Sequence, residues 1–437
     1  FLFRGISMKF MIVTLGCKVN AYESEFMLES MLSSGYFYNE ENPDIVIINT
    51  CSVTNIADRK SRKLVRRARR EHSDAVLVVV GCSTQNNWEE YSNMGIDILL
   101  GNRKKSEIAS LIGEYLKTKE PYAYYTKNRA LDFEDMNVDK FTTHTRAFVK
   151  IEDGCDNFCS YCIIPFTRGS IRSKEFLKVI EEVKILVANG HKEIVLTGIH
   201  TGSYSSDGHD LSDLILELSK IDGLERIRIS SIEITELNDK FLDLLKHNGK
   251  IANHLHIPLQ SGSDTVLGKM NRKYDTEYFR EKIKKIRAIR PSISITTDCI
   301  VGHPYEDDEC FNEYYDFCKE INFSKLHVFP YSIRNGTAAA SMPQVDDEIK
   351  KIRVHKLLKL SDELELEYYS KFLGEELDVL TEEYEGEYTV GFTSNYIKVY
   401  LKGEYKLNQI YTCKLEKINK MNVYASVASC LKEESKI

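Results

Sequence analysis

Short apolar runs alternate with amphipathic stretches over the first third of the chain. The apolar runs cover residues 9–15, 44–50, 75–81 and 97–102, and they are rich in β-branched residues. The stretches that follow the first two runs carry their apolar residues at helical spacing. Continuous apolar strands separated by helices are typical of a parallel sheet covered on both faces. We therefore expect an open α/β domain over residues 8–120.

The middle of the chain resumes this alternation with six further strand candidates. They cover residues 146–152, 193–199, 226–232, 254–259, 294–302 and 325–332. Helical stretches separate them, and six βα units are too few to close an eight-stranded barrel. An open barrel segment, a partial (β/α)6 barrel, is expected within a core of residues 141–371. In such folds the chemistry lies at the carboxyl ends of the strands.

The last part of the chain has a different pattern. A long amphipathic helix is expected over residues 346–373, and Gly374 follows it. Five short strand candidates come next, at residues 376–383, 388–394, 396–401, 409–418 and 422–429. This pattern favours a small β-barrel, of a kind that often binds RNA, over residues 374–437. The predicted fold class is α/β, with an irregular linker at residues 121–140 between the first two domains.

Composition narrows the class of protein without deciding its function. No apolar run approaches the ~20 residues that a transmembrane helix needs, so we expect no membrane contact and a cytoplasmic location. Met8 is expected to be the start of the protein, with residues 1–7 as a leader. The formal net charge of −7 argues mildly against a nucleic-acid binder, although local charge can differ from the average.

Three of the eleven cysteines, Cys155, Cys159 and Cys162, lie close together in a loop opened by Gly154. A disulfide framework is not expected in a long chain without a secretory signal. A structural zinc ion and a 4Fe-4S cluster both normally take four protein ligands, and no fourth lies nearby. Three thiolates would leave one iron open, and S-adenosylmethionine could chelate that iron through its amino and carboxylate groups. A zinc site completed from afar is the alternative.

Three more cysteines, Cys17, Cys51 and Cys82, each follow one of the first three predicted strands. The carboxyl ends of parallel strands share one edge of the sheet, so these thiols should meet in space. We expect a second three-cysteine 4Fe-4S cluster there, with three separately buried thiols as the alternative. The remaining five are expected to be small buried hydrophobes: Cys299, Cys310, Cys318, Cys413 and Cys430.

The C-x3-C-x2-C spacing, with Tyr161 before the last cysteine, resembles the radical SAM superfamily. Segments at later strand ends, such as "LTGIHTG", "SSIE", "HIPLQSGS" and "TTDCIVGHPYED", also match. The resemblance implies contacts to S-adenosylmethionine from Gly198, Gly202, Ser230, Glu233, Gln260, Ser261 and Gly302. Relatives usually read G-x-P-G-E in the last segment, whereas Tyr305 stands here in place of the second glycine.

Two three-cysteine sets followed by a small β-barrel resemble the methylthiotransferase family, from Met8 to about residue 432. The resemblance implies an N-terminal methylthiotransferase domain, a radical SAM core and a C-terminal TRAM domain. The segment "GCKVN" is similar to the type that acts on threonylcarbamoyladenosine in tRNA. The implied reaction inserts a methylthio group at carbon 2 of that adenosine at tRNA position 37. It requires S-adenosylmethionine, two 4Fe-4S clusters and an electron donor protein.

Three other functions stay open. The same chemistry could act on isopentenylated adenosine, whose enzymes tend to read G-C-Q-M-N, or on a ribosomal protein aspartate, whose enzymes tend to read G-C-P-K-N. A redox or RNA-binding module without catalysis is the third, although electron carriers saturate their clusters with four protein ligands. Reductive cleavage of S-adenosylmethionine would exclude that module.

Residues 59–70 contain eight Lys or Arg and no acid. At helical spacing one face would carry Arg59, Lys63, Arg66 and Arg70. A solvated helix face is the simpler interpretation, but the position just after Cys51 favours contact with the tRNA backbone. Candidates for base stacking, or for the core of the small barrel, are Phe392, Tyr396 and Tyr400.

Overall fold

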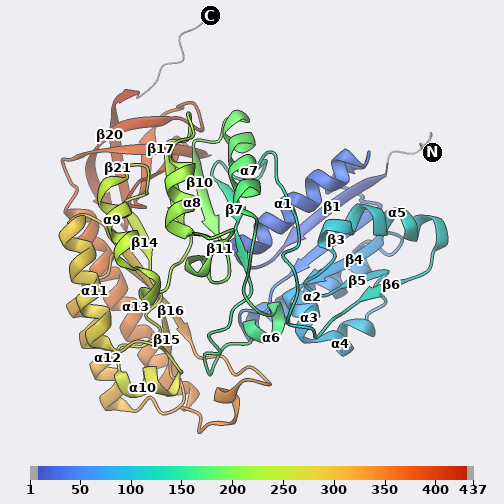
Figure 1. The fold of residues 1–437 in the computed structure, drawn as a ribbon, viewed down its shortest axis with the longest axis horizontal. Coiled ribbons are helices and arrows are strands. Elements are labelled where there is room, and N and C mark those ends of the chain that lie inside the picture. The colour runs from blue at the N-terminus through green and yellow to red at the C-terminus, as the bar shows by residue number, and fades with distance from the viewer. Residues whose placement is uncertain (1–7, 431–437) are drawn as a thin grey trace, which may run out of the picture.

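The computed structural model describes residues 8–430. Residues 1–7, the expected leader, and residues 431–437, the end of the predicted C-terminal domain, lie outside this range. Figure 1 shows an N-terminal sheet in blue and cyan, a central unit from green to orange, and a red barrel at the C-terminus. No helix among the described residues is long and apolar enough to cross a membrane.

The N-terminal sheet has six parallel strands, and four of them are the expected ones. In spatial order they are β2 (Phe37–Tyr38), β1 (Lys9–Thr14), β3 (Ile45–Thr50), β4 (Val76–Gly81), β5 (Ile98–Leu100) and β6 (Tyr122–Tyr124). The expectation of an irregular linker is wrong for β6, which pairs with β5 at one edge of the sheet.

Helices cover both faces of this sheet. Apolar residues of α1 (Lys18–Ser33) and α5 (Ile108–Thr118) pack on one face. Residues of α2 (Asn55–Glu71) and α4 (Trp88–Ser92) pack on the other. Every residue of β3 and β4 is buried as a result, which explains why β4 is apolar throughout and β3 is apolar over residues 45–48.

The central unit is the open barrel segment that the alternation predicted. Its strands, in spatial order, are β7 (Ala147–Lys150), β10 (Glu193–Thr197), β13 (Arg226–Ile229), β14 (His254–His256), β15 (Ser294–Val301) and β16 (Lys325–Pro330). They form two three-stranded parallel sheets joined by one bridge, between Ile227 and Ile251. The outer helices are α7 (Phe176–Ala188), α8 (Leu211–Leu218), α9 (Asp239–His247), α10 (Asp264–Lys269), α11 (Thr276–Ile289), α12 (Asp308–Ile321) and α13 (Asp347–Ser370).

The N-terminal domain spans the open side of this barrel. Helix α1 lies beside β7 at one edge. Beyond the other edge strand, β16, Arg334 Nη1 reaches Asp58 Oδ2 of α2 at 2.6 Å and Asn55 Oδ1 at 2.8 Å. The carboxyl ends of the N-terminal strands are thereby held against the carboxyl ends of the barrel strands.

The C-terminal unit is a closed five-stranded barrel, as predicted. Its strands are β17 (Glu376–Glu385), β18 (Tyr388–Thr393), β19 (Lys398–Lys402), β20 (Ile410–Asn419) and β21 (Asn422–Cys430). It packs on the amino ends of the core strands, where Arg226 Nη1 donates to Phe392 O at 3.3 Å and Arg146 pairs with Glu382 at 2.8 Å.

The three candidate stacking residues of this barrel already pack against other aromatic rings of the chain. Phe392 and Tyr396 stack on each other with ring centroids 5.2 Å apart, and the Arg146 guanidinium lies over both rings. Tyr400 meets Tyr388 edge-on at 6.0 Å. The first two rings therefore join the barrel to the core, at the end opposite the core cysteines.

Candidate active site

Cys17, Cys51 and Cys82 lie together at the carboxyl edge of the N-terminal sheet. Cys17 precedes α1, Cys51 follows β3, and Cys82 opens α3 (Cys82–Asn86). The three thiols are close enough to interact electrostatically. Gly16 has φ +111, and a Cβ at that position would lie 2.7 Å from Cys51 Sγ. A glycine is needed there because the two cysteine loops approach so closely.

Burial makes two of these thiols, Cys51 and Cys82, hard to deprotonate in the metal-free chain. It raises the pKa of Cys51 to about 12 and also raises the pKa of Cys82. The Arg168 guanidinium opposes both shifts. Arg168 Nη2 also donates to Asn20 Oδ1 at 2.9 Å. Asn20 in turn donates to Leu15 O at 2.7 Å and Thr50 O at 3.0 Å, so it ties the Cys17 loop to the Cys51 loop.

Arg168 belongs to a buried ionic network between the N-terminal domain and the core. Its Nη1 lies 3.0 Å from Glu23 Oε1 and 3.1 Å from Asp153 Oδ1. Lys105 and Lys150 complete the ring around Glu23, at 2.5 and 2.9 Å. Burial alone would raise the pKa of Glu23, but these three cations lower it below its ordinary range. The network therefore joins the two cysteine-bearing units through buried ion pairs.

Cys155, Cys159 and Cys162 lie on one loop between β8 (Glu152–Asp153) and α6 (Ile164–Arg168). Burial raises the pKa of Cys155 and of Cys162 to about 12. Helix α6 follows this loop directly and ends at Arg168, beside the N-terminal thiols. The two cysteine sites are therefore neighbours across one short helix.

Arg272 is the cation beside this second site, and sequence reasoning missed it. Its Nη1 donates to Cys159 Sγ at 3.4 Å, and its Nη2 pairs with Glu233. Glu233, one of the expected cofactor contacts, also caps a short 3-10 helix at Ile234–Glu236. No local motif around Arg272 signals this role, because the contact depends on the tertiary fold.

Gly198 and Gly202 lie against two carboxylates. A Cβ at Gly198 would be 2.8 Å from Glu152 Oε2, and one at Gly202 would overlap the Glu236 carboxylate. Glu152 is fully buried; its Oε2 accepts from His200 N at 2.6 Å, while its Oε1 has no partner. Burial raises the pKa of Glu152 to about 8. An orphaned carboxylate oxygen fits an ammonium donor such as the amino group of S-adenosylmethionine.

The other expected cofactor contacts are more dispersed. Ser230 follows β13 and is half-buried, and Gln260 has φ +68 with its side-chain amide unbonded to any described residue. Ser261 was expected to contact S-adenosylmethionine, but it is fully buried, and its hydroxyl accepts from Ser263 N at 3.3 Å. Gly302 has φ +74, and its N donates to Glu306 Oε1 at 2.9 Å.

The residues of the basic helix are placed on α2 as expected. All four are exposed: Arg59, Lys63, Arg66 and Arg70. Arg66 pairs with Glu90 at 3.2 Å, and Arg70 lies 3.7 Å from Glu71. Arg59 and Lys63 have no ion pair with a described residue. These two charges are therefore free for an anionic partner.

The donor sets fit thiolate-held iron–sulfur clusters. Each set has three thiols, and in the core set a backbone N–H is directed at Cys155 sulfur and a guanidinium N–H at Cys159 sulfur. Within residues 8–430, no three His, Cys, Asp or Glu side chains converge as they would around a single metal ion. Of the other cysteines, four are buried as expected: Cys299, Cys310, Cys318 and Cys413. The side chain of Cys430 is outside the described set.

Comparison with known proteins places these features in a family. The radical SAM superfamily model matches residues 149–318, and a model described as uncharacterized protein family UPF0004 matches residues 9–101. Threonylcarbamoyladenosine tRNA methylthiotransferase MtaB of Bacillus subtilis (strain 168) is 45% identical, over 89% of this chain and 89% of its own length. The protein of the same name from Aquifex aeolicus (strain VF5) is 38% identical, over 91% of this chain and 97% of its own.

A solved structure supports the fold. The radical S-adenosylmethionine methyltransferase TsrM from Kitasatospora setae, with cobalamin and a 4Fe-4S cluster bound, matches with a TM-score of 0.56. The match covers 77% of each chain at 15% identity. At that identity it concerns the architecture alone.

Proposed function

Because the chain belongs to the methylthiotransferase family of radical SAM enzymes, we propose that it inserts a methylthio group into tRNA. The atom modified is carbon 2 of N6-threonylcarbamoyladenosine at position 37. The observation that carries the proposal is the position of two three-cysteine sites on either side of α6. Likeness to proteins named for that substrate, at 45% identity, gives the substrate class.

The cofactors of this family are two 4Fe-4S clusters and S-adenosylmethionine. We propose that Cys17, Cys51 and Cys82 would hold one cluster, and that the three thiols of the loop before α6 would hold the other. When bound, these groups supply the radical, the methyl group and the sulfur that the reaction needs.

The chain's own residues prepare both sites for anionic ligands. Each ligand thiol must lose a proton when a cluster binds, which burial alone disfavours. Arg168 and Arg272 place a positive charge beside each thiol set, and both arginines are themselves buried. Glu152 presents a carboxylate oxygen without a partner where an ammonium group would dock. Gly198, next to it, leaves room for the Glu152 carboxylate itself, because a Cβ there would lie 2.8 Å from Glu152 Oε2.

The RNA would approach along α2. Its phosphates would be contacted by Arg59, Lys63, Arg66 and Arg70. An electron donor protein would supply reducing equivalents in the cytoplasm.

We propose three domains, at residues 8–120, 141–371 and 374–437. We also propose that the remaining expected residues contact S-adenosylmethionine. Ser261 is the least accessible of those contacts, because it is fully buried.

Mass spectrometry of tRNA nucleosides tests the function. A host that lacks this activity is compared with and without the gene. Appearance of 2-methylthio-threonylcarbamoyladenosine only with the gene supports the proposal, and Cys17→Ala or Cys159→Ala should then abolish it. Appearance of methylthiolated isopentenyladenosine instead would correct the substrate. If folded protein carrying both clusters yields neither nucleoside, a protein substrate becomes the better hypothesis.

A further inference from the structure

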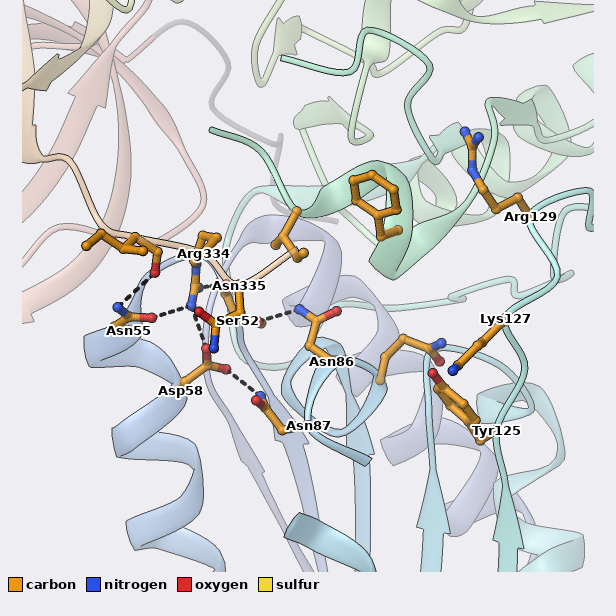
Figure 2. A pocket seen from close by; sticks show the side chains of 14 residues that line it. Ser52, Asn55, Asp58, Asn86, Asn87, Tyr125, Lys127, Arg129, Arg334 and Asn335 are labelled. Atoms are coloured by element: carbon orange, nitrogen blue, oxygen red, sulfur yellow. Dashed lines mark hydrogen bonds and ion pairs between the residues drawn. The ribbon is translucent and has the colours of Figure 1, made fainter. Parts of the chain in front are cut away.

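A cavity of about 460 Å³ lies beside both cysteine sites. Ser52, which follows Cys51, and Ile163, which follows Cys162, both line it. Asn86 of α3 links the two sides of this cavity, because it donates to Ser52 Oγ at 2.6 Å and accepts from Thr167 Oγ1 at 2.5 Å. Figure 2 shows Ser52 and Asn86 between α2, which carries Asn55 and Asp58, and the segment that carries Tyr125, Lys127 and Arg129. Its size falls in the range of sites that bind small organic groups.

The lining of this cavity has the chemistry that recognises a nucleobase. The acidic group, Asp58, is already neutralised by Arg334 at 2.6 Å. The amide of Asn335 and the hydroxyl of Tyr125 have no hydrogen-bond partner among the described residues. Trp88 stacks on the Tyr125 ring at 4.9 Å and 20°, which holds that ring in a fixed orientation. Free amide and hydroxyl groups beside a fixed aromatic ring are how proteins read an unstacked base.

The cavity continues into a groove along α2. A second hollow of about 500 Å³ shares Asn55, Asp58, Asn87 and Asn335 with it and adds Arg59 and Arg62. A third hollow of about 490 Å³, lined by Arg66 and Arg69, adjoins the second at Glu90. Glu90 is shared by Arg62 and Arg66, each at 3.2 Å, and Arg69 is paired with Asp97 at 2.7 Å. Arg59 has no ion pair with a described residue. The groove is therefore net positive, with the excess charge on Arg59, Arg62 and Arg66.

We propose that the cavity holds one splayed-out base of the tRNA loop, next to the adenosine that is modified, and that the groove carries the adjoining phosphates. The inference rests on the proposed function and adds to it a second nucleotide site. The positive track fits a phosphate backbone, and the cavity at its end is where a base can leave the stack.

A double-mutant cycle between protein and RNA tests this site. Holoenzyme with both clusters is titrated with labelled anticodon stem–loop RNAs, each lacking the base at one loop position. Tyr125→Ala should weaken binding of the intact RNA roughly 5- to 150-fold, the effect of losing one base stack. At one loop position, removal of the base should weaken RNA binding to the wild type by a similar factor. The same RNA should bind the Tyr125→Ala variant no more weakly than the intact RNA does. Asn335→Ala should show the same coupling with a smaller factor.

The matched control is Tyr278→Ala, which removes an exposed tyrosine on α11, away from the groove. It should leave the Kd unchanged. Losses that multiply at every loop position would overturn the proposal. A second outcome would also overturn it: the Tyr125→Ala variant binds RNA normally and is active with dithionite, but loses activity with a protein reductant. The cavity would then belong to the surface that receives the electron donor. Wild-type enzyme that neither binds nor methylthiolates any tRNA would instead refute the proposed function itself.

Discussion

The two three-cysteine sites differ in how the chain assembles them. Cys155, Cys159 and Cys162 occupy a single loop, so their proximity follows from local sequence. Cys17, Cys51 and Cys82 come from three separate βα units and meet only because parallel strands end at one edge. The first kind of site can be recognised from a short sequence motif. The second depends on the whole sheet and on close approaches such as that of Gly16 to Cys51.

Despite this difference, the charged groups at the two sites are arranged in the same way. Each combines buried thiols of raised pKa with one buried arginine, Arg168 at the N-terminal site and Arg272 at the core site. The arginines are held differently. Arg168 pairs with Glu23 and Asp153 in the interface between two domains. Arg272 pairs with Glu233 near the carboxyl ends of the barrel strands. Comparable substitutions should therefore have unequal costs.

The largest expected effect separates the two sites by function. Cys82→Ala and Cys159→Ala should each abolish methylthiolation and each lower the iron content from about eight to about four atoms per chain. Only Cys159→Ala should also abolish reductive cleavage of S-adenosylmethionine, because the core site is the one beside Glu152 and its glycines. Iron analysis and product assays on the purified variants measure this. Cys413→Ala, at a buried thiol in the C-terminal barrel, is the control and should keep both clusters. Loss of cleavage in both variants would mean that the sites are not separable.

The next effect concerns stability. Arg168→Gln removes one cation from a buried network in which Glu23 keeps Lys105 and Lys150, and Asp153 keeps Lys150 and Arg172. The substitution should cost about 1.5–3 kcal/mol of unfolding free energy, because it removes charged hydrogen bonds and leaves no carboxylate without a cation. Arg272→Gln should cost less, because the side chain of its partner Glu233 is 16% exposed and can be hydrated. Urea unfolding of the metal-free variants measures both. Equal losses would show that the interdomain network contributes nothing beyond a single ion pair.

A pH dependence sharpens the comparison at the core site. The pKa of Glu152 is about 8 in the folded chain against an ordinary 4.5, so the unfolded chain releases this proton first as pH rises. The unfolding free energy should therefore fall between pH 4.5 and 8, by about 2 kcal/mol between pH 6 and 8. Glu152→Gln should remove that contribution and leave the smaller one of Glu306, whose burial raises its pKa to about 7. The same substitution at the exposed Glu71 should leave the wild-type slope in place. An identical slope in the wild type and in Glu152→Gln would exclude a neutral Glu152.

Hydrophobic patterning predicted most of the fold. The barrel strands, the small C-terminal barrel and four strands of the first sheet are long enough for apolar alternation or continuity to identify them. The edge strands β2 and β6 have only two and three residues, and each is defined by the neighbour with which it pairs. Local sequence carries no comparable signal for such short elements.

The residues of the candidate site also differ in whether the sequence alone could identify them. Six cysteines could be grouped, because spacing and strand order are properties of the sequence. Arg168, Arg272 and Glu152 could not be found, because their partners come from distant segments. The periodicity of α2 indicated a basic face but not its neighbour α4, which places Arg62 and Arg69 in the groove and leaves Lys63 and Arg70 outside it. Helical spacing defines a face; packing decides which residues on it form a groove.

The smallest expected effect contrasts the backbone at the two sites. Gly16 cannot be replaced without moving Cys51, whereas Tyr305 occupies a left-handed position, φ +69, where the radical SAM resemblance led us to expect glycine. A non-glycine residue there costs about 1–2 kcal/mol, and glycine costs about 0.5–1 kcal/mol in backbone entropy. Tyr305→Gly should therefore stabilise the chain by about 0.5–1 kcal/mol in urea unfolding. Tyr305→Ala keeps the strain and should give no gain. If alanine stabilises as much as glycine, the exposed ring and its contact with Lys269, rather than the backbone, set the cost at this position.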